Sequence, residues 1–344
     1  MNSTVNYAQV ITTDSSLPFS QLREWALRIL APAAPAILLF GLISNIINII
    51  VFFKAGLKDN VTILLFFLAI SDLTFIILIT PTPCTLIVLR FARSWSWPFQ
   101  PDFTYFLLYW PAFTAYDLSA FISVSLGVMR CACVAMPLKF KFVFTRRRTI
   151  LTVFVLFVLA VSLRIPMLSI FRVAWRTDAA TNVTTAYLAA VNRVAMSRIN
   201  DVMNRGLVVW INYTIMVSCV ALLSFKLSEA SKIRRSCTFN NDSTSEKTAV
   251  HGLSPKDLQV VKSVVIVCVI FIFSQLPFLL YSTARLINPE LTSTSRMRKL
   301  FSFLSHVSLT CSYLNASLNI FVYYNYNSKY RSVLISLLPS RKNH

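Results

Sequence analysis

Charged side chains are scarce in this chain of 344 residues, because Asp, Glu, Lys and Arg together make up only 13% of it. Hydrophobic residues make up 56%, and the mean hydropathy is +0.64. A soluble domain rarely combines so few charges with so much apolar side chain. The composition therefore excludes an ordinary water-soluble protein and favours one that is embedded in a membrane.

Glycine is also scarce, with 5 residues, and the chain shows no internal repeat. Transporters commonly carry repeats and helices broken by glycine, so a transporter or ligand-gated channel is only a distant alternative. The 7 cysteines form no disulfide framework, and no Cys-x-x-Cys pair occurs with a pair of histidines. No nucleophile with a matching base and no metal-ligand set is apparent, so an enzyme is not expected.

Acidic residues number 13 against 33 Lys and Arg, which gives a formal net charge of +20. In a soluble protein this balance would indicate nucleic-acid binding. Here the basic residues lie between apolar stretches, where they mark the edges of a membrane and its cytoplasmic side. We expect contacts with membrane lipids and none with nucleic acid.

Seven apolar stretches are long enough to cross a bilayer, which takes about 20 residues in a helix. If the N-terminus lies outside, Arg146-Arg147-Arg148 and every lysine except Lys299 fall on inner segments. The sequence therefore predicts an all-α, multi-pass protein of the plasma membrane: a seven-transmembrane helix bundle with its N-terminus outside. The expected spans are 30–53, 61–89, 103–136, 149–171, 206–228, 258–286 and 298–324.

This topology divides the chain into an extracellular segment 1–29, the bundle 30–324, and a cytoplasmic tail 325–344. Residues 1–24 lack the pattern of a cleaved signal peptide, so none is expected. The sequons at Asn2 and Asn182 would lie outside and are the expected glycosylation sites.

The tail predicts a short amphipathic eighth helix along the inner membrane surface, from Ser328 to Leu338. Its apolar face is made by four side chains, Tyr330, Val333, Leu334 and Leu337.

Polar side chains occur within the apolar spans, where they must pair with one another or with water. Asp72 lies in the second span and Ser119 in the third, while Asn315 and Asn319 share one face of the seventh. A carboxylate with several neutral oxygens could hold a small hard cation such as sodium, with waters completing its coordination. A hydrogen-bonded polar core without an ion is an equal alternative.

Arg130 lies at the inner end of the third span, where a charge indicates a functional site by default. It falls within about 20° of the helix face that carries Ser119.

The order of these residues resembles the rhodopsin-like (class A) G-protein-coupled receptor family over almost the whole chain. The similar motifs are Gly41-Leu42-Ile43-Ser44-Asn45 in helix one, Leu68-Ala69-Ile70-Ser71-Asp72-Leu73 in helix two, Met129-Arg130-Cys131 in place of D-R-Y, Phe271 and Pro277 in helix six, and Asn319-Ile320-Phe321-Val322-Tyr323 in place of N-P-x-x-Y.

The resemblance implies a receptor that signals by helix rearrangement to a heterotrimeric G protein, without a cofactor except the candidate structural sodium ion. It also implies that an agonist outside favours an outward swing of helix six near Pro277. The residues expected to act in coupling and activation are Arg130, Tyr323, Asn319, Pro277 and Phe271.

The chain departs from the family pattern at several of these positions. Met129 replaces the acidic residue that restrains the arginine in the resting state, so raised basal activity is expected. Gln275 replaces the tryptophan of helix six, and Tyr105 stands where the outer disulfide cysteine is expected. These departures resemble the chemosensory receptors of molluscs, for small water-borne or peptide ligands; a neuropeptide receptor of the same family is the alternative.

In this family ligands enter from outside, and Tyr116, Gln275 and Tyr281 are the candidate ligand-binding side chains, although each could simply be a core residue. Ala112 stands where amine receptors carry an aspartate, so an amine ligand is not expected. Asp117 faces about 140° away from Arg130 and is expected to pair with polar groups of a neighbouring helix.

Basic side chains flank the outer ends of the spans, and the planar fork of arginine suits carboxylates. They indicate an acidic small-molecule or peptide ligand, with lipid-headgroup contact as the alternative for any single one. The residues are Arg90, Arg93, Arg164, Arg172, Arg176, Arg193, Arg198, Arg205, Arg285, Arg296, Arg298 and Lys299.

Overall fold

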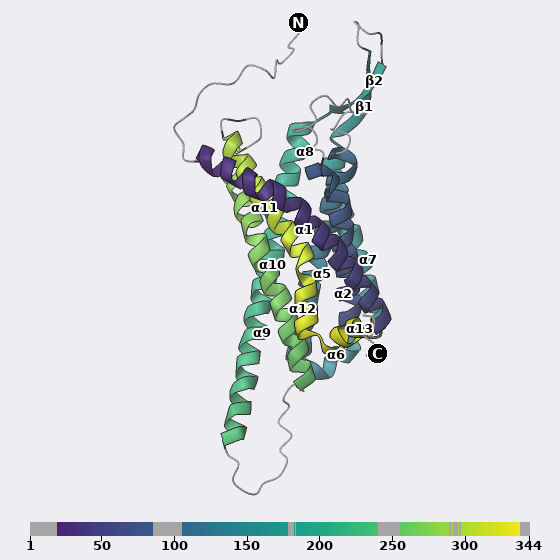
Figure 1. The fold of residues 1–344 in the computed structure, drawn as a ribbon, viewed down its shortest axis with the longest axis vertical. Coiled ribbons are helices and arrows are strands. Elements are labelled where there is room, and N and C mark those ends of the chain that lie inside the picture. The colour runs from purple at the N-terminus through teal and green to yellow at the C-terminus, as the bar shows by residue number, and fades with distance from the viewer. Residues whose placement is uncertain are drawn as a thin grey trace, which may run out of the picture.

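Long helices run side by side in the computed structural model, with a β-hairpin at one end (Figure 1). The structure describes residues 19–84, 105–177, 182, 184–239, 255–288, 290–291, 295 and 297–337. The long helices are α1 (Phe19–Ala55), α2 (Asn60–Ile79), α5 (Trp110–Ala135), α7 (Arg146–Leu168), α9 (Val208–Phe239), α10 (Pro255–Ile287) and α11 (Arg298–Ser317).

Shorter helical elements extend or connect the long helices. A π-helix, η1, leads into α5, and α8 followed by a second π-helix, η2, leads into α9. The short elements are η1 (Tyr105–Tyr109), α6 (Pro137–Val143), α8 (Arg193–Asn200), η2 (Asp201–Leu207), α12 (Asn319–Tyr326) and α13 (Ser328–Leu337).

Local sequence signals fix the turn between α1 and α2. Gly56 adopts a positive φ of 83°, a conformation that glycine accepts without strain. Asp59 then caps α2, because its Oδ1 accepts a hydrogen bond from the Thr62 backbone N–H at 2.8 Å. Within α1, a Cβ added to Gly41 would overlap Ser317 of α11, so glycine allows these two helices to approach closely.

Six of the described helices are long and apolar enough to cross a membrane by length and composition, in agreement with the first six predicted spans. The seventh predicted span, 298–324, forms α11 and α12, which meet at Leu318. Its composition is less apolar because six buried polar side chains face the bundle: Ser308, Thr310, Ser312, Asn315, Ser317 and Asn319. The seven-helix bundle is therefore confirmed, with a polar seventh helix.

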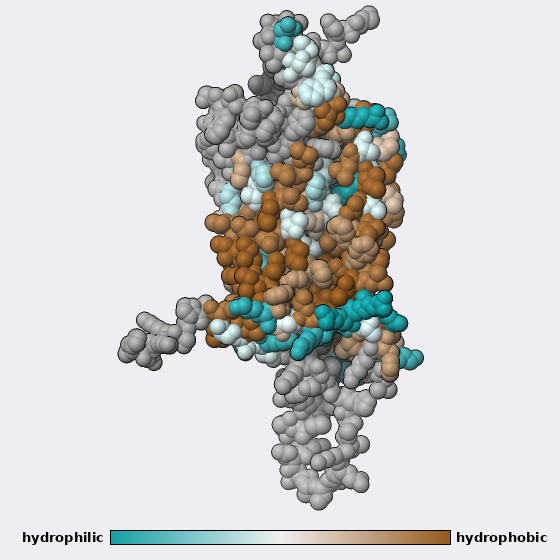
Figure 2. Space-filling model, turned by 90° about the vertical axis from the view of Figure 1, so that its right-hand side faces the viewer, coloured by the Kyte–Doolittle hydropathy of each residue, from teal (hydrophilic) through white to brown (hydrophobic). Residues whose placement is uncertain are grey.

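The outer surface of the bundle matches the requirements of a bilayer. Figure 2 shows a band of hydrophobic residues across the middle of the molecule, bordered below by hydrophilic ones. On α7, large apolar side chains such as Phe154, Phe157 and Val158 are exposed. Exposed apolar side chains of this kind face lipid without penalty, so they agree with a membrane-spanning helix.

A β-hairpin follows α7, and the all-α prediction missed it. Strands β1 (Phe171–Thr177) and β2 (Thr184–Ala190) pair antiparallel, with Phe171 opposite Ala190 and Thr177 opposite Thr184. The fourth span accordingly ends at Leu168 rather than at 171. The segment alternates side chains along an extended backbone, a period that an apolar-span search does not detect.

The predicted amphipathic eighth helix is α13, which lies across the inner end of the bundle near the end of α1 (Figure 1). Tyr330 is buried, and Val333, Leu334 and Leu337 pack against the same apolar core. The Tyr330 hydroxyl donates to Asn48 Oδ1 at 2.6 Å, and burial raises the pKa of this phenol. The helix is therefore fastened to α1 as well as oriented by its apolar face.

Candidate functional site

Asp72 lies at the centre of a polar cluster in the middle of the bundle. Its Oδ1 accepts a hydrogen bond from Ser119 Oγ at 2.6 Å, and its Oδ2 accepts one from Asn319 Nδ2 at 2.9 Å. All three side chains are buried, and they come from α2, α5 and α12. The structure thus brings together three of the four residues predicted to share a polar site.

The fourth residue, Asn315, bonds elsewhere. Its Oδ1 accepts a hydrogen bond from Ser274 Oγ of α10 at 3.0 Å. Asn45 closes the other side of the region, since its Nδ2 donates to the Gly41 and Ala316 carbonyls at 2.9 and 2.8 Å. The network therefore links α1, α2, α5, α10 and the seventh helix.

The donor set fits sodium chemically, because one carboxylate and neutral oxygens suit a hard monovalent cation. Both Asp72 oxygens already accept one hydrogen bond each, yet each carboxylate oxygen has a further lone pair. A sodium ion at Asp72, Ser119, Asn315 and Asn319 remains a prediction.

A cavity between α5, α9 and α10 contains two of the three predicted ligand-binding side chains. Gln275 Nε2 donates to the Tyr116 hydroxyl at 2.8 Å, and both residues are buried. The cavity is lined by Phe113, Tyr116, Asp117, Ala120, Val208, Val209, Asn212, Tyr213, Phe271, Gln275 and Phe278. Its walls are mostly apolar, with polar groups on α5 and at Asn212, Tyr213 and Gln275.

Tyr281, the third predicted ligand-binding residue, does not line this cavity. A hydrogen bond joins its Oη to Ser305 Oγ at 3.0 Å, and its ring packs edge-on against Phe301. It lies further along α10, at the outer end of the bundle. Its role in ligand binding stays a prediction.

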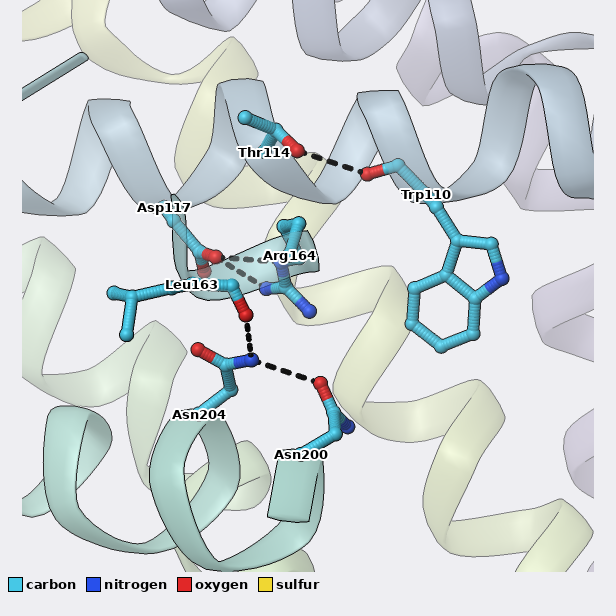
Figure 3. Close-up of polar contacts among 7 residues, drawn as sticks. All are labelled: Trp110, Thr114, Asp117, Leu163, Arg164, Asn200 and Asn204. Atoms are coloured by element: carbon cyan, nitrogen blue, oxygen red, sulfur yellow. Dashed lines mark hydrogen bonds and ion pairs between the residues drawn. The ribbon is translucent and has the colours of Figure 1, made fainter. Parts of the chain in front are cut away.

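Asp117 is partly buried and forms an ion pair with the buried Arg164 of α7, which Figure 3 shows at the centre of a polar cluster. Arg164 Nε donates to Asp117 Oδ2 at 2.8 Å, and Nη2 donates to the same oxygen. The guanidinium also lies 5.8 Å from the centre of the Phe113 ring. The prediction that Asp117 pairs with a neighbouring helix is confirmed, and the charge of Arg164 is therefore balanced within the bundle.

Asn204 of η2 extends this cluster to a third helix (Figure 3). Its Nδ2 donates to the Leu163 carbonyl at 2.6 Å and to Asn200 Oδ1 at 2.8 Å. The adjacent cavity wall is thus held by bonds among α5, α7 and the segment that leads into α9.

The residues expected to act in coupling lie toward the inner end. Met129, Phe271 and Tyr323 belong to one buried apolar cluster, and Arg130 is partly buried at the end of α5. Pro277 lies inside α10, where proline removes one backbone hydrogen bond. The structure places Phe271 both in this inner cluster and in the wall of the cavity.

A second charged cluster, which the sequence did not indicate, joins η2 to α10. Asp201 Oδ2 lies 2.9 Å from Arg285 Nη2, and Asp201 Oδ1 lies 3.4 Å from Arg205 Nε. Both arginines were predicted only as members of a diffuse basic outer side. Only an i,i+4 spacing could have signalled the pairing of Arg205 with Asp201, and nothing local signals Arg285.

The predicted glycosylation sites differ in how far the structure describes them. Asn182 lies between the two hairpin strands and is exposed, with a positive φ of 54°. Asn2 lies outside the described residues. Glycosylation of either residue stays a prediction.

Compared with known protein families, the chain matches 7 transmembrane receptor (rhodopsin family) over residues 44–323. No curated protein matches the chain. The matched range begins within α1 and ends within α12, so it spans all seven membrane-crossing helices.

Proposed function

Because this chain belongs to the rhodopsin family of seven-transmembrane receptors, we propose that it is a chemosensory receptor that couples to a heterotrimeric G protein. Members of this family are receptors, and the chain is a multi-pass protein of the plasma membrane. The ligand we propose is a small water-borne molecule or a peptide.

The position of Phe271 is the observation that carries this proposal. Phe271 lines the cavity beside Gln275, and it also packs in the inner cluster with Met129 and Tyr323. A ligand that displaces Phe271 would therefore alter the packing around Met129, the residue that precedes Arg130. If the ligand binds one arrangement of α10 more tightly than the other, it shifts the receptor population toward that arrangement.

Guanine-nucleotide exchange by purified G proteins tests the coupling. The full chain in lipid nanodiscs is mixed with representatives of each G-protein class, and exchange is measured against empty nanodiscs. We expect exchange above the receptor-free rate with at least one class, and loss of that excess in Arg130→Gln. The matched control is Arg147→Gln, an exposed inner arginine at the start of α7.

Two results would contradict the proposal. One is the absence of exchange with every class although the receptor is folded. The other is ion flux in receptor-containing liposomes without a G protein, which would favour the transporter or channel alternative.

A neuropeptide receptor of the same family is the second candidate for the ligand class. Ala112 is buried and uncharged, so neither candidate pairs an ammonium group at that position. Expression in sensory epithelium would favour the chemosensory role, whereas expression confined to central neurons would favour the neuropeptide role.

A further inference from the structure

Two arginines share one carboxylate at the outer end of α10. Asp201 is the ion-pair partner of both Arg205 and Arg285, at 3.4 and 2.9 Å. The exposed fractions of the three side chains are only 22%, 18% and 16%. Among the described residues, the cluster therefore holds one more positive than negative charge in a mostly buried position, which is unfavourable without a further anion.

One nitrogen of the cluster lacks a hydrogen-bond acceptor. Arg205 Nη1 is buried and has no hydrogen-bond partner within the part of the chain that the structure describes. A buried donor of this kind is destabilising unless an acceptor reaches it. An anionic acceptor would both bond to Nη1 and neutralise the excess charge.

Aromatic rings hold the two guanidinium groups in place. The Arg205 guanidinium carbon lies 5.8 Å from the centre of the Tyr281 ring, and that of Arg285 lies 5.5 Å from the centre of the Phe301 ring. Such contacts stabilise and orient a cation but do not neutralise it. The Tyr281 hydroxyl, bonded to Ser305, adds a further polar group beside Arg205.

The arginine pair lies outward of the cavity described above, and aromatic rings of α10 lie between the two. The rings of Phe278, in the cavity wall, and Tyr281 lie 6.5 Å apart. Along α10, Arg285 lies about 15 Å outward of Gln275 at 1.5 Å per residue. A ligand with an anionic group at the arginine pair would therefore place its remaining part against the rings of Tyr281, Phe301 and Phe278.

The other outer arginines whose side chains the structure describes lack this combination. Arg164 has its own carboxylate in Asp117, and Arg172, Arg198 and Arg298 are exposed. Among the outer basic side chains that the structure describes, Arg205 and Arg285 combine burial, excess charge and an unsatisfied donor.

We propose that Arg205 and Arg285 bind the carboxylate of the receptor's ligand, and that this ligand carries an aromatic or apolar body. A carboxylate can accept from Arg205 Nη1 and at the same time neutralise the excess charge. This inference rests on the proposed receptor function, because it assigns the chemistry of that receptor's ligand.

Thermal unfolding with a matched pair of probes tests the site. The full chain in phosphatidylcholine nanodiscs is titrated with 3-phenylpropionate or with its neutral amide, at constant ionic strength. We expect the carboxylate to raise the unfolding midpoint by about 2 °C or more and the amide to leave it unchanged. No G protein is present, so a failure here is independent of a failure of nucleotide exchange.

Three variants locate the effect. Arg205→Gln should weaken the apparent affinity for 3-phenylpropionate at least tenfold, whereas Arg198→Gln, on the adjacent α8, should leave it unchanged. Since Arg205→Gln removes the excess charge, its ligand-free midpoint should equal or exceed that of the parent chain. Asp201→Asn increases the excess charge, so it should lower the ligand-free midpoint and enlarge the shift produced by the carboxylate.

Equal stabilisation by acid and amide, or an undiminished shift in Arg205→Gln, would overturn the proposal. A third result would also overturn it. If phosphatidylserine in the nanodisc raises the unfolding midpoint and 3-phenylpropionate then has no further effect, the site binds a lipid headgroup. If Arg205→Gln does not fold, the response of Asp201→Asn decides, and an unchanged shift in that variant counts against the site.

Discussion

Two carboxylates inside the same bundle, Asp72 and the partly buried Asp117, are stabilised by different kinds of partner. Asp72 has neutral partners, the Ser119 hydroxyl and the Asn319 amide, whereas Asp117 has the guanidinium of Arg164. A carboxylate with neutral partners can still accept a cation or a proton, while one in an ion pair is already neutralised. The difference assigns Asp72 to a site that can change state and Asp117 to a fixed connection between α5 and α7.

The different partners also predict different losses of folding stability when each aspartate is substituted. Removing one member of a buried ion pair leaves an uncompensated charge and destabilises a protein by about 3–5 kcal/mol. Losing a hydrogen bond from an uncharged donor to a carboxylate costs about 1.5–3 kcal/mol, and neutralising a buried carboxylate without an ionic partner offsets part of that cost. Substitutions at the two aspartates therefore provide a direct test of the comparison.

The largest effect is expected for Asp117→Asn. The variant keeps the shape of the side chain but leaves Arg164 charged and buried, so the free energy of unfolding should fall by about 3–5 kcal/mol. Thermal unfolding of the detergent-solubilised receptor and its cell-surface level measure this loss.

The double variant Asp117→Asn with Arg164→Gln serves as the control. It removes both charges, so it should recover most of the lost stability. If the single variant is as stable as the double variant, Arg164 is not a buried cation that depends on Asp117.

Met129→Asp extends the comparison to Arg130, whose preceding residue is apolar where the family has an acid. A carboxylate beside Arg130 should restrain it, so ligand-free nucleotide exchange should fall severalfold at equal surface level. Met129 is only 3% exposed, so burial of the new carboxylate is unfavourable, and Met129→Asn controls for lost packing. Unchanged or increased ligand-free exchange would refute the proposed restraint.

The polar side chains differ in how far the sequence predicts their partners. Asp72, Ser119 and Asn319 could be grouped because each is a polar residue within an apolar span, a placement that the sequence gives directly. The α13 face was predictable for a similar reason, since its apolar side chains follow the helical period. These inferences need only the membrane and one helix at a time.

Other contacts depend on how the helices rotate and pack against one another. Asn315 shares a helix face with Asn319, yet it bonds to Ser274, because α10 approaches that side. The pairing of Asp201 with Arg285 joins residues that are 84 positions apart. The β-hairpin was also missed, because a search for apolar helices does not test for extended strands.

A smaller effect on stability is expected for Asp72→Asn. The amide replaces one carboxylate oxygen with a donor, so one hydrogen bond is lost, but the buried charge is removed with it, and the net fall in stability should be only about 1 kcal/mol. If sodium binds with Asp72, Ser119, Asn315 and Asn319, as we propose, sodium chloride should raise the unfolding midpoint of the parent chain above its value in choline chloride.

That sodium effect should disappear in Asp72→Asn and persist in Asp59→Asn, an exposed aspartate. Equal midpoints of the parent chain in the two salts would instead support a hydrogen-bonded core without an ion. Asp72 would then still differ from Asp117 in energy, although it would no longer be a cation site.

Tyr330→Phe is expected to have the smallest effect on stability. It tests a hydrogen bond between two neutral side chains at the inner end of the bundle. The variant removes the hydroxyl that bonds to Asn48 but keeps the ring contacts with Phe52 and Tyr323. Stability at neutral pH should fall by about 0.5–1.5 kcal/mol, as for other neutral hydrogen bonds. Thermal unfolding measures this change, with the exposed Tyr324→Phe as control.

Alkaline pH sharpens this last test. Because burial raises the pKa of Tyr330 above its ordinary value of about 10, the folded state favours the neutral phenol. Its contribution to stability is fully present below the ordinary value and is lost as the pH rises above it. The parent chain should therefore lose stability above about pH 10 more steeply than Tyr330→Phe, and parallel curves would show that this phenol is not buried as the structure places it.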